Sequence, residues 1–145
     1  MNSIFGNKVI KKIIIQNLGS WLLILDSKKK TMKKIETSLS TLKSDISNFY
    51  KADAHQFMVM NIVDMVEKLE IQWFFADYAH PCDITCFYTL SEPTIQIPSI
   101  AGIVGGAWVA EAELVDLMGV EIENAKKGFV LEDDFEGGSP LRKKK

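Results

Sequence analysis

The chain has 145 residues, of which 47% are hydrophobic and 25% are charged, with a formal net charge of −2. This length supplies enough apolar material for one compact core, and it predicts a single domain. One arginine, Arg142, accompanies sixteen lysines, which argues against a nucleic-acid reader or an arginine-clamped phosphotransfer enzyme because both depend on the forked guanidinium group.

The charges are unevenly distributed along the chain. Residues 1–50 carry nine Lys and three acidic residues, whereas residues 51–140 carry four Lys and sixteen acidic residues. A basic part and an acidic part can attract each other within one protomer or between protomers. Two solvated faces without such pairing explain the pattern equally well.

The cysteines and the N-terminal apolar run both bear on location. Cys82 and Cys86 are too few for a disulfide framework, which indicates a reducing, intracellular setting. The apolar run at residues 13–25 follows three lysines but contains polar residues and is too short to span a bilayer. We therefore expect a cytoplasmic protein that is not held by a membrane.

The first half of the chain is predicted to be helical. A short helix or strand is expected over residues 8–25, and a longer helix is expected from about residue 27, because apolar residues recur at alternating steps of three and four up to residue 49. The residues of this coiled-coil-like seam are Met32, Ile35, Leu39, Leu42, Ile46 and Phe49. They are candidates for a homo-oligomer interface, and packing against the next helix of the same chain is an equally good reading.

That next helix is expected over residues 54–70. Asp53 is a suitable N-cap, and apolar residues fall on one helical face. The two helices would form a helical hairpin within a helical layer that covers residues 8–70.

The amino-acid composition changes at residue 71, where strand-forming residues become frequent. Residues 71–78, 84–90 and 94–97 have strand composition, and the first two are expected to form an antiparallel hairpin. A helix over residues 108–118 should end at Gly119, and residues 120–123 and 129–132 should form a second hairpin with Gly128 at positive φ.

The predicted fold is therefore α+β. It has N-terminal amphipathic helices, then an antiparallel sheet of about five strands with one inserted helix. A single domain is expected over residues 1–132, with its sheet-rich part at residues 71–132. Residues 133–145 are acidic, then Gly-rich, then basic, which predicts a disordered charged tail.

A metal site is one possible use of the first hairpin loop. His80, Cys82 and Cys86, with Asp77 nearby, are residue types that bind zinc. Their spacing matches no zinc module, so an ordinary loop with a buried thiol at Cys86 is the favoured reading.

A glycine-rich turn before the helix at 108–118 is a second candidate site. Backbone N–H groups of Gly102, Gly105 and Gly106, beside Trp108, could hold a small anion or a nucleotide at a helix N-terminus. The spacing of a dinucleotide-binding or phosphate loop is missing, so a flexible or tightly packed linker is favoured.

These observations predict a non-enzymatic interaction protein that self-associates through its heptad helix. Trp73, Phe75 and Tyr88 are candidate anchors for a second protein if they are exposed. The alternative is a small-ligand binding or sequestering protein that uses the glycine turn and the aromatic strands. No catalytic set can be assembled from spacing, and no cofactor is expected. The expected partner is a second copy of the chain, then another protein or a small anionic ligand. No motif in the sequence is specific to a protein family.

Overall fold

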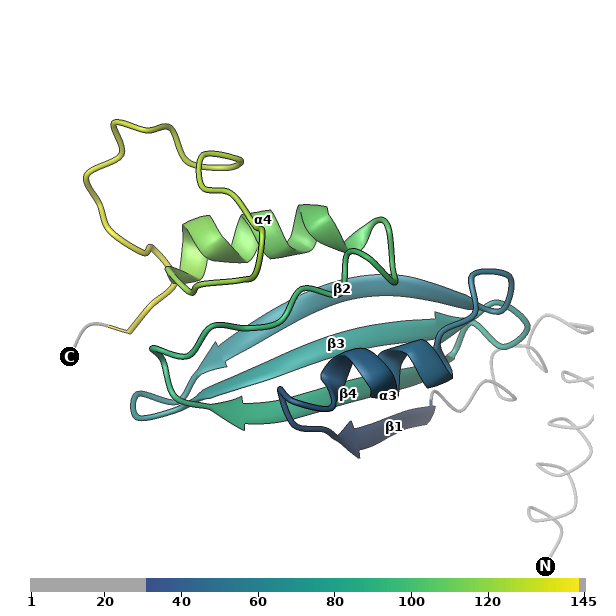
Figure 1. Cartoon of the computed structure of the whole chain (residues 1–145). Coiled ribbons are helices and arrows are strands. Elements are labelled where there is room, and N and C mark those ends of the chain that lie inside the picture. Colours follow the sequence, from purple (N-terminus) through teal and green to yellow (C-terminus); the bar gives the residue numbers. More distant parts are fainter. Residues whose placement is uncertain (1–30, 144–145) are drawn as a thin grey trace, which may run out of the picture. The chain divides into compact units, whose positions relative to one another are not determined.

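The computed structural model describes residues 31–143, and in this range the chain forms a four-stranded sheet and two helices. Figure 1 shows their arrangement. In chain order the elements are β1 (Thr31–Glu36), α3 (Leu42–Phe49), β2 (His55–Asp64), β3 (Leu69–Asp77), β4 (Asp83–Ser91) and α4 (Ala107–Met118).

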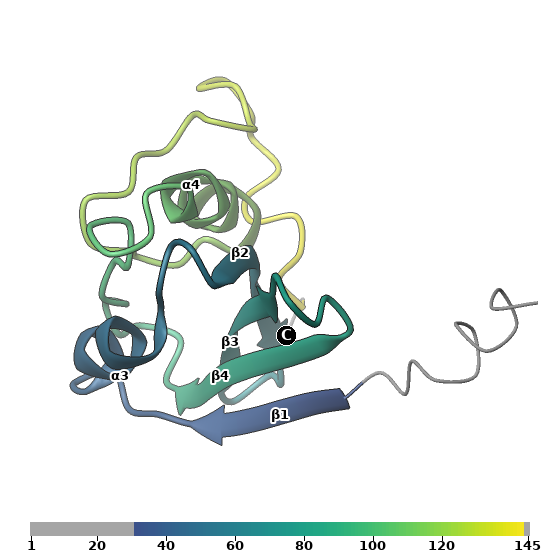
Figure 2. The ribbon, with the colours of Figure 1, turned by 90° about the vertical axis from the view of Figure 1, so that its right-hand side faces the viewer.

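The sheet is mixed, with the strand order β1-β4-β3-β2. Strands β2, β3 and β4 form an antiparallel meander in which Met60 lies opposite Trp73 and Trp73 lies opposite Phe87. The arrows of β1 and β4 run the same way in Figures 1 and 2, so β1 adds a parallel edge. A backbone hydrogen bond from the N–H of Thr37 to the carbonyl oxygen of Tyr88 extends this edge beyond β1.

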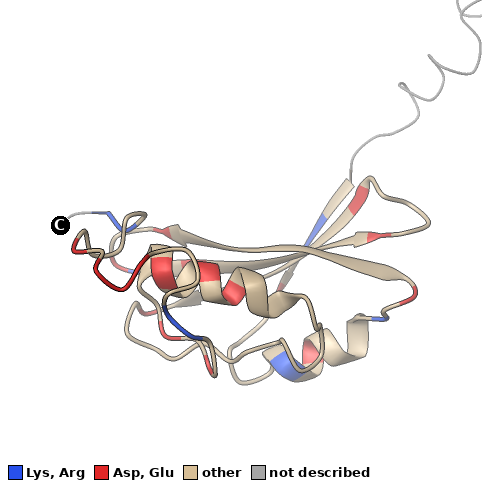
Figure 3. Ribbon diagram, turned by 90° about the horizontal axis from the view of Figure 1, so that it is seen from above, with Lys and Arg blue, Asp and Glu red and all other residues tan. Residues whose placement is uncertain are grey.

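Both helices cover the same face of the sheet, as the view from above shows (Figure 3). The period of two in β3 places Leu69, Ile71, Trp73 and Phe75 on that face, where each is at most 1% exposed. The rest of the core comes from α3, α4 and the segments beside α4. Its members include Leu42, Ile46, Ile97, Ile100, Leu114, Val115, Met118 and Ile122.

Two sequence predictions are confirmed in this part of the chain. Strands β3 and β4 are antiparallel neighbours, as residues 71–78 and 84–90 predicted. Helix α4 ends where Gly119 adopts φ 63°, and its N–H donates to the carbonyl oxygen of Val115. Within residues 31–143, no helix has the length and apolar character needed to cross a membrane.

The predicted N-terminal helical layer is wrong for the described residues. The seam of residues 32–49 is divided between β1, a turn and the eight-residue helix α3. The turn forms because Thr37 and Thr41 donate side-chain hydrogen bonds to Asp45, at 2.6 and 2.9 Å, and so favour a local loop over a continuous helix. The prediction for residues 8–25 lies outside the described residues.

The predicted helix over residues 54–70 is also wrong, because β2 occupies its first part. Met60, Ile62 and Asp64 are buried, while the residues between them are exposed, which is the period of a strand. As an edge strand, β2 carries apolar residues on both faces, among them the exposed Val59 and Val63. That pattern imitates helical spacing.

The sheet has four strands rather than the predicted five or so in residues 31–143. Residues 94–97 and 120–123 contribute one isolated parallel bridge, Ile97 to Ile122, and residues 129–132 form no strand. Gly128 does take positive φ, at 85°. The described part of the segment predicted to be disordered, residues 133–143, has no helix or strand, but its backbone is tied to α4 by the hydrogen bond from Leu141 N–H to Leu117 O.

Candidate functional site

A pocket of about 440 Å³ opens beside the first turns of α4, and we call it the α4 pocket. Helix α4 forms one wall, and the loop after Ile122 forms the other. The residues that matter most for its chemistry are Ser99, Ala101, Trp108, Glu111, Lys126 and Phe129. Its size is within the range of pockets that hold small ligands or side chains.

Two aromatic rings stand at the mouth of the α4 pocket. Trp108 and Phe129 are 53% and 48% exposed, and their ring centroids lie 5.4 Å apart in an edge-to-face arrangement. Small side chains from Ala101, Ala112 and Ala125 complete much of the apolar lining and leave its volume free. The arrangement suits an apolar group better than a hydrated one.

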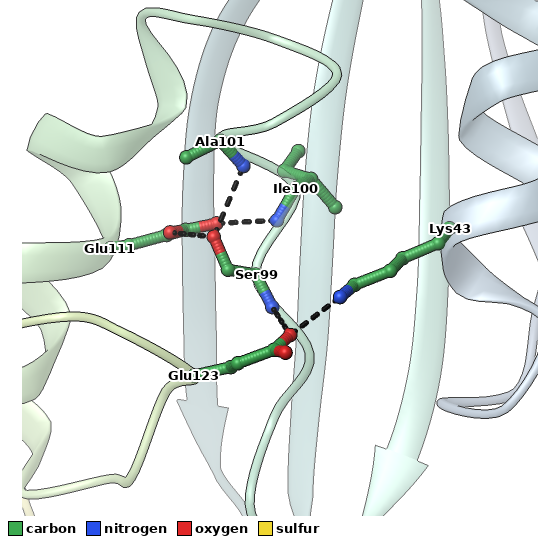
Figure 4. A network of polar contacts seen from close by, with 6 residues as sticks. All are labelled: Lys43, Ser99, Ile100, Ala101, Glu111 and Glu123. Carbon is green, nitrogen blue, oxygen red and sulfur yellow. Dashed lines mark hydrogen bonds and ion pairs between the residues drawn. The ribbon is translucent and has the colours of Figure 1, made fainter.

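The floor of the pocket is organised by Glu111, whose carboxylate is buried against the segment before the glycine turn (Figure 4). Its Oε2 accepts a hydrogen bond from Ser99 Oγ at 2.7 Å, and its Oε1 accepts one from the N–H of Ile100 at 2.8 Å. Burial raises the pKa of Glu111, and the hydrogen bond from Ser99 opposes part of this shift. Glu111 therefore fixes the segment that leads into the helix carrying it.

A second carboxylate, Glu123, joins this network from the other wall. Its Oε2 accepts hydrogen bonds from Lys43 Nζ at 2.6 Å and from the N–H of Ser99 at 3.3 Å. The hydrogen bond from Lys43 holds the pKa of Glu123 below its usual range. Helix α3, residue 99 and the loop after Ile122 thus meet at one ion pair.

A third carboxylate, Asp116, shapes the loop of the pocket from the far side of α4. It is 8% exposed and accepts hydrogen bonds from the N–H groups of Gly128, Val130 and Leu131, at 2.9, 2.7 and 3.2 Å. These bonds, led by the one from Val130, hold the pKa of Asp116 below its usual range. They explain why residues 129–132 form no hairpin strand: their donors point to α4.

Replacing Asp116 by Asn should loosen this loop, because an amide oxygen is a weaker acceptor than a carboxylate for three N–H groups. The stability that Asp116 contributes to the wild type is present above the ordinary pKa of Asp and is lost as pH falls through the lowered folded value. We therefore expect Asp116→Asn to lose less stability on acidification than the wild type does. Amide hydrogen exchange at residues 128–131 measures the loosening. Glu113→Gln, on an exposed position of the same helix, is the matched control and should leave exchange unchanged.

The C-terminal segment is held by a fourth carboxylate, Asp64, at the end of β2. Its side chain is 4% exposed and accepts hydrogen bonds from Arg142 Nε at 2.8 Å, from Lys143 N–H at 3.0 Å and from Val66 N–H at 2.8 Å. The bond from the backbone of Lys143 is the main cause of the lowered pKa of Asp64. Arg142, the single arginine of the chain, thus holds the C-terminal segment against the end of β2.

Replacing Arg142 by Ala should release the segment around it, since Asp64 would lose the guanidinium group that pairs with it. Faster amide exchange at Leu141, whose N–H donates to Leu117 O, would report the release. Lys143→Ala is the control, because Lys143 contacts Asp64 through its backbone. Equal exchange in the two variants would contradict a specific role for the guanidinium group.

The glycines of the predicted anion site lie in the exposed turn that leads into α4. A Cβ added at Gly102, Gly105 or Gly106 would meet no atom within 4 Å, and none of the three has positive φ. Gly106 is the N-cap of α4 and provides no side-chain cap. Of the predicted ligand-binding residues, Trp108 lines the α4 pocket, and anion binding by the glycine turn stays a prediction.

The residues of the predicted metal site lie in β4 and in the loop before it. Cys86 is fully buried in β4, and burial raises the pKa of its thiol, while Cys82 lies in the loop before that strand. Asp77 accepts hydrogen bonds from the N–H groups of Ala79 and His80, at 2.7 and 3.1 Å. In the described part of the chain, no three His, Cys, Asp or Glu residues gather in a group that could hold a metal ion.

The predicted partner anchors differ in exposure. Trp73 and Phe75 are core residues at 0% and 1% exposure, whereas Tyr88 is half-buried with Lys34 Nζ 5.4 Å from its ring. Of the seam residues, Leu42 and Ile46 are fully buried, Met32 is exposed, and Ile35, Leu39 and Phe49 pack against the core. The seam therefore offers little surface for a second copy.

Sequence reasoning missed the carboxylates that organise the site. Neither Glu111 nor Asp116 is among the predicted site residues, although a usable signal exists. Apolar neighbours at helical spacing surround each of them, with Ala107 and Val115 four residues on either side of Glu111. An acid at the centre of such a stripe faces the core and needs partners.

Comparison with known proteins places the chain in a family and gives a structural relative. Residues 31–145 match the family model described as the respiratory-chain NADH dehydrogenase 30 kDa subunit. No curated protein matches the sequence. A chain in the structure of the membrane-bound sulfane sulfur reductase, an archaeal respiratory membrane complex, has the same fold, with a TM-score of 0.67 and 16% identity over 94% of this chain and 83% of that chain.

These findings overturn the prediction of a generic accessory protein that pairs with itself through a coiled coil. The heptad residues Leu42 and Ile46 are internal, and the matching family is named for a subunit of a larger enzyme, so other subunits replace a second copy as the expected partners. Because the family model covers all but the first 30 residues, the chain belongs to the family of the 30 kDa subunit of respiratory-chain NADH dehydrogenase.

Proposed function

We propose that this chain is a structural subunit of a multi-subunit respiratory membrane complex, in which it contacts neighbouring subunits. The observation that carries the proposal is that the described residues expose many large apolar side chains to solvent. They do so in a domain that belongs to the family of a respiratory-chain subunit. Contiguous exposed apolar side chains mark protein interfaces.

One such surface lies along the edge strand of the sheet. We define the β2 surface as the exposed residues Met58, Val59, Val63, Met65 and Val66. Strand β2 is ten residues long and ends the sheet. A long apolar edge of this kind promotes aggregation unless a partner covers it, which supports a role inside an assembly.

The polar residues of the domain support an architectural role as well. Glu111, Glu123, Asp116 and Asp64 each accept hydrogen bonds from the protein itself and fix the loops around α4 and the C-terminal segment. They give the domain a fixed outer shape for its neighbours, which is the quality that a docking subunit needs.

Co-migration of a tagged chain on native gels tests the proposal directly. A tagged copy of the full chain, expressed at its natural level, should co-migrate with a large membrane complex on native gels after mild detergent extraction. Val59→Glu with Val63→Glu should abolish co-migration and leave the isolated chain folded, whereas Gln56→Glu on the same strand should not. A wild-type chain that migrates alone would overturn the proposal.

We propose further that the domain lies on the cytoplasmic side of the membrane. The thiols of Cys82 and Cys86 are both free, which suits a reducing compartment. Protease added to inverted vesicles should digest the chain, and protease added to right-side-out vesicles should spare it. The reverse pattern would place the domain on the opposite side.

A further inference from the structure

We propose that the α4 pocket receives a bulky apolar side chain from an acidic segment of a neighbouring subunit. Trp108 and Phe129 would grip the apolar side chain, and Lys126 and Lys127 would pair with the carboxylates beside it. The inference rests on the proposed function, because the segment belongs to another subunit of the complex.

The lining of the pocket favours an apolar occupant. Trp108 and Phe129 expose about half of their surface at its mouth, and alanines supply much of the remaining wall. Aromatic side chains that stand exposed around a pocket are the usual anchors of protein interfaces. Covering them removes apolar surface from water, which is the main driving force of association.

The polar groups of the lining argue against a small anion inside the pocket. Glu111 and Glu123 both line it, and each carboxylate already accepts hydrogen bonds from the protein. Glu111 accepts them from Ser99 and Ile100. Glu123 accepts them from Lys43 and Ser99. A phosphate or nucleotide placed there would meet carboxylates. An uncharged side chain meets no such repulsion.

The rim of the pocket supplies the opposite charge. Lys126 and Lys127 are exposed on the loop, and in residues 31–143 neither forms an ion pair, whereas Lys34 and Lys43 do. Figure 3 shows this basic stretch on the loop beside the acidic residues of α4. Two unpaired ammonium groups next to an apolar pocket favour a segment with carboxylates on the flank of its anchor.

The loop that carries these groups is held before any partner arrives. Asp116 binds the N–H groups of Gly128, Val130 and Leu131 and so fixes the backbone on both sides of Phe129. Less conformational entropy is then lost on docking. The loop of the pocket is therefore ordered before a partner binds.

Site-specific crosslinking in the assembled complex tests the inference. Phe129→p-benzoylphenylalanine in the full chain, irradiated in the purified membrane complex, should attach to one segment whose sequence, read by mass spectrometry, has an apolar residue with at least two Asp or Glu close by. Adding Lys126→Glu and Lys127→Glu should lower the crosslink yield at least fivefold. The pair Lys33→Glu and Lys51→Glu, exposed elsewhere, makes the same charge change and should leave the yield unaltered.

Three results would overturn the inference: a crosslinked segment without acidic residues, no crosslink in a complex that contains the chain, or an equal loss of yield in both charge-reversed pairs. Co-migration of the wild-type chain separates this failure from failure of the proposed function. A chain that co-migrates but does not crosslink at residue 129 leaves the subunit role intact and removes the docking pocket. A chain that does not co-migrate removes both.

Discussion

Replacing Leu42 by Asp should unfold the domain rather than release a folded monomer. Leu42 is 0% exposed and packs with Ile46 in the core beneath α3. A carboxylate at this position would be buried without a partner, at a cost of several kcal/mol, and would also leave part of the leucine volume unfilled. Since small domains have a total stability of about 5–15 kcal/mol, most of the folded population should be lost.

Circular dichroism and urea titration of Leu42→Asp measure this outcome, and Ser47→Asp provides the control. Ser47 lies in the same helix but is exposed, so its replacement should shift the urea midpoint little. A soluble Leu42→Asp variant with a native spectrum would contradict the internal position of the seam.

The seam shows why spacing alone misled the prediction for residues 32–49. Met32 and Ile35 are three residues apart, which places them on one face of a helix but on opposite faces of a strand. In the fold they belong to β1, and Leu42 and Ile46 belong to α3. Two short elements in sequence thus reproduced the rhythm of one long helix.

The parts of the fold that sequence predicted well are those whose local and tertiary preferences agree. Strands β3 and β4 are rich in aromatic and β-branched residues, and α4 ends at a glycine in the left-handed conformation. Strand β2 was missed because its outer surface carries apolar as well as polar residues, so polar and apolar residues do not alternate regularly along it. Val59 and Val63 are the residues that hid its period.

The site was predictable only in part, since its chemistry comes from contacts between distant residues. Trp108 could be picked out beside the glycine turn. The partners of Glu111 lie at residues 99 and 100, and those of Asp116 lie at residues 128, 130 and 131. One sequence does not reveal which backbone donors a buried carboxylate will meet.

Replacing Glu111 should produce the second large effect, and the size of the effect should depend on the substitute. Glu111→Ala removes the acceptor for Ser99 Oγ and Ile100 N–H and leaves buried donors unsatisfied. We expect the free energy of unfolding to fall by about 2–4 kcal/mol. Glu111→Gln keeps an acceptor for Ile100 and can donate to Ser99 Oγ, so its cost should stay within about 1 kcal/mol.

The pH dependence of stability distinguishes the carboxylate of Glu111 from the amide of Gln. Burial raises the pKa of Glu111 in the folded state, so between the ordinary pKa of Glu and the raised folded value the native protein binds more protons than the unfolded chain. Stability from this group therefore declines as pH rises through that window. Urea titrations across the window should show this decline in the wild type and in Glu113→Gln, but not in Glu111→Gln. A decline that persists in Glu111→Gln would assign the titration to another group. It would also mean that burial does not raise the pKa of the Glu111 carboxylate.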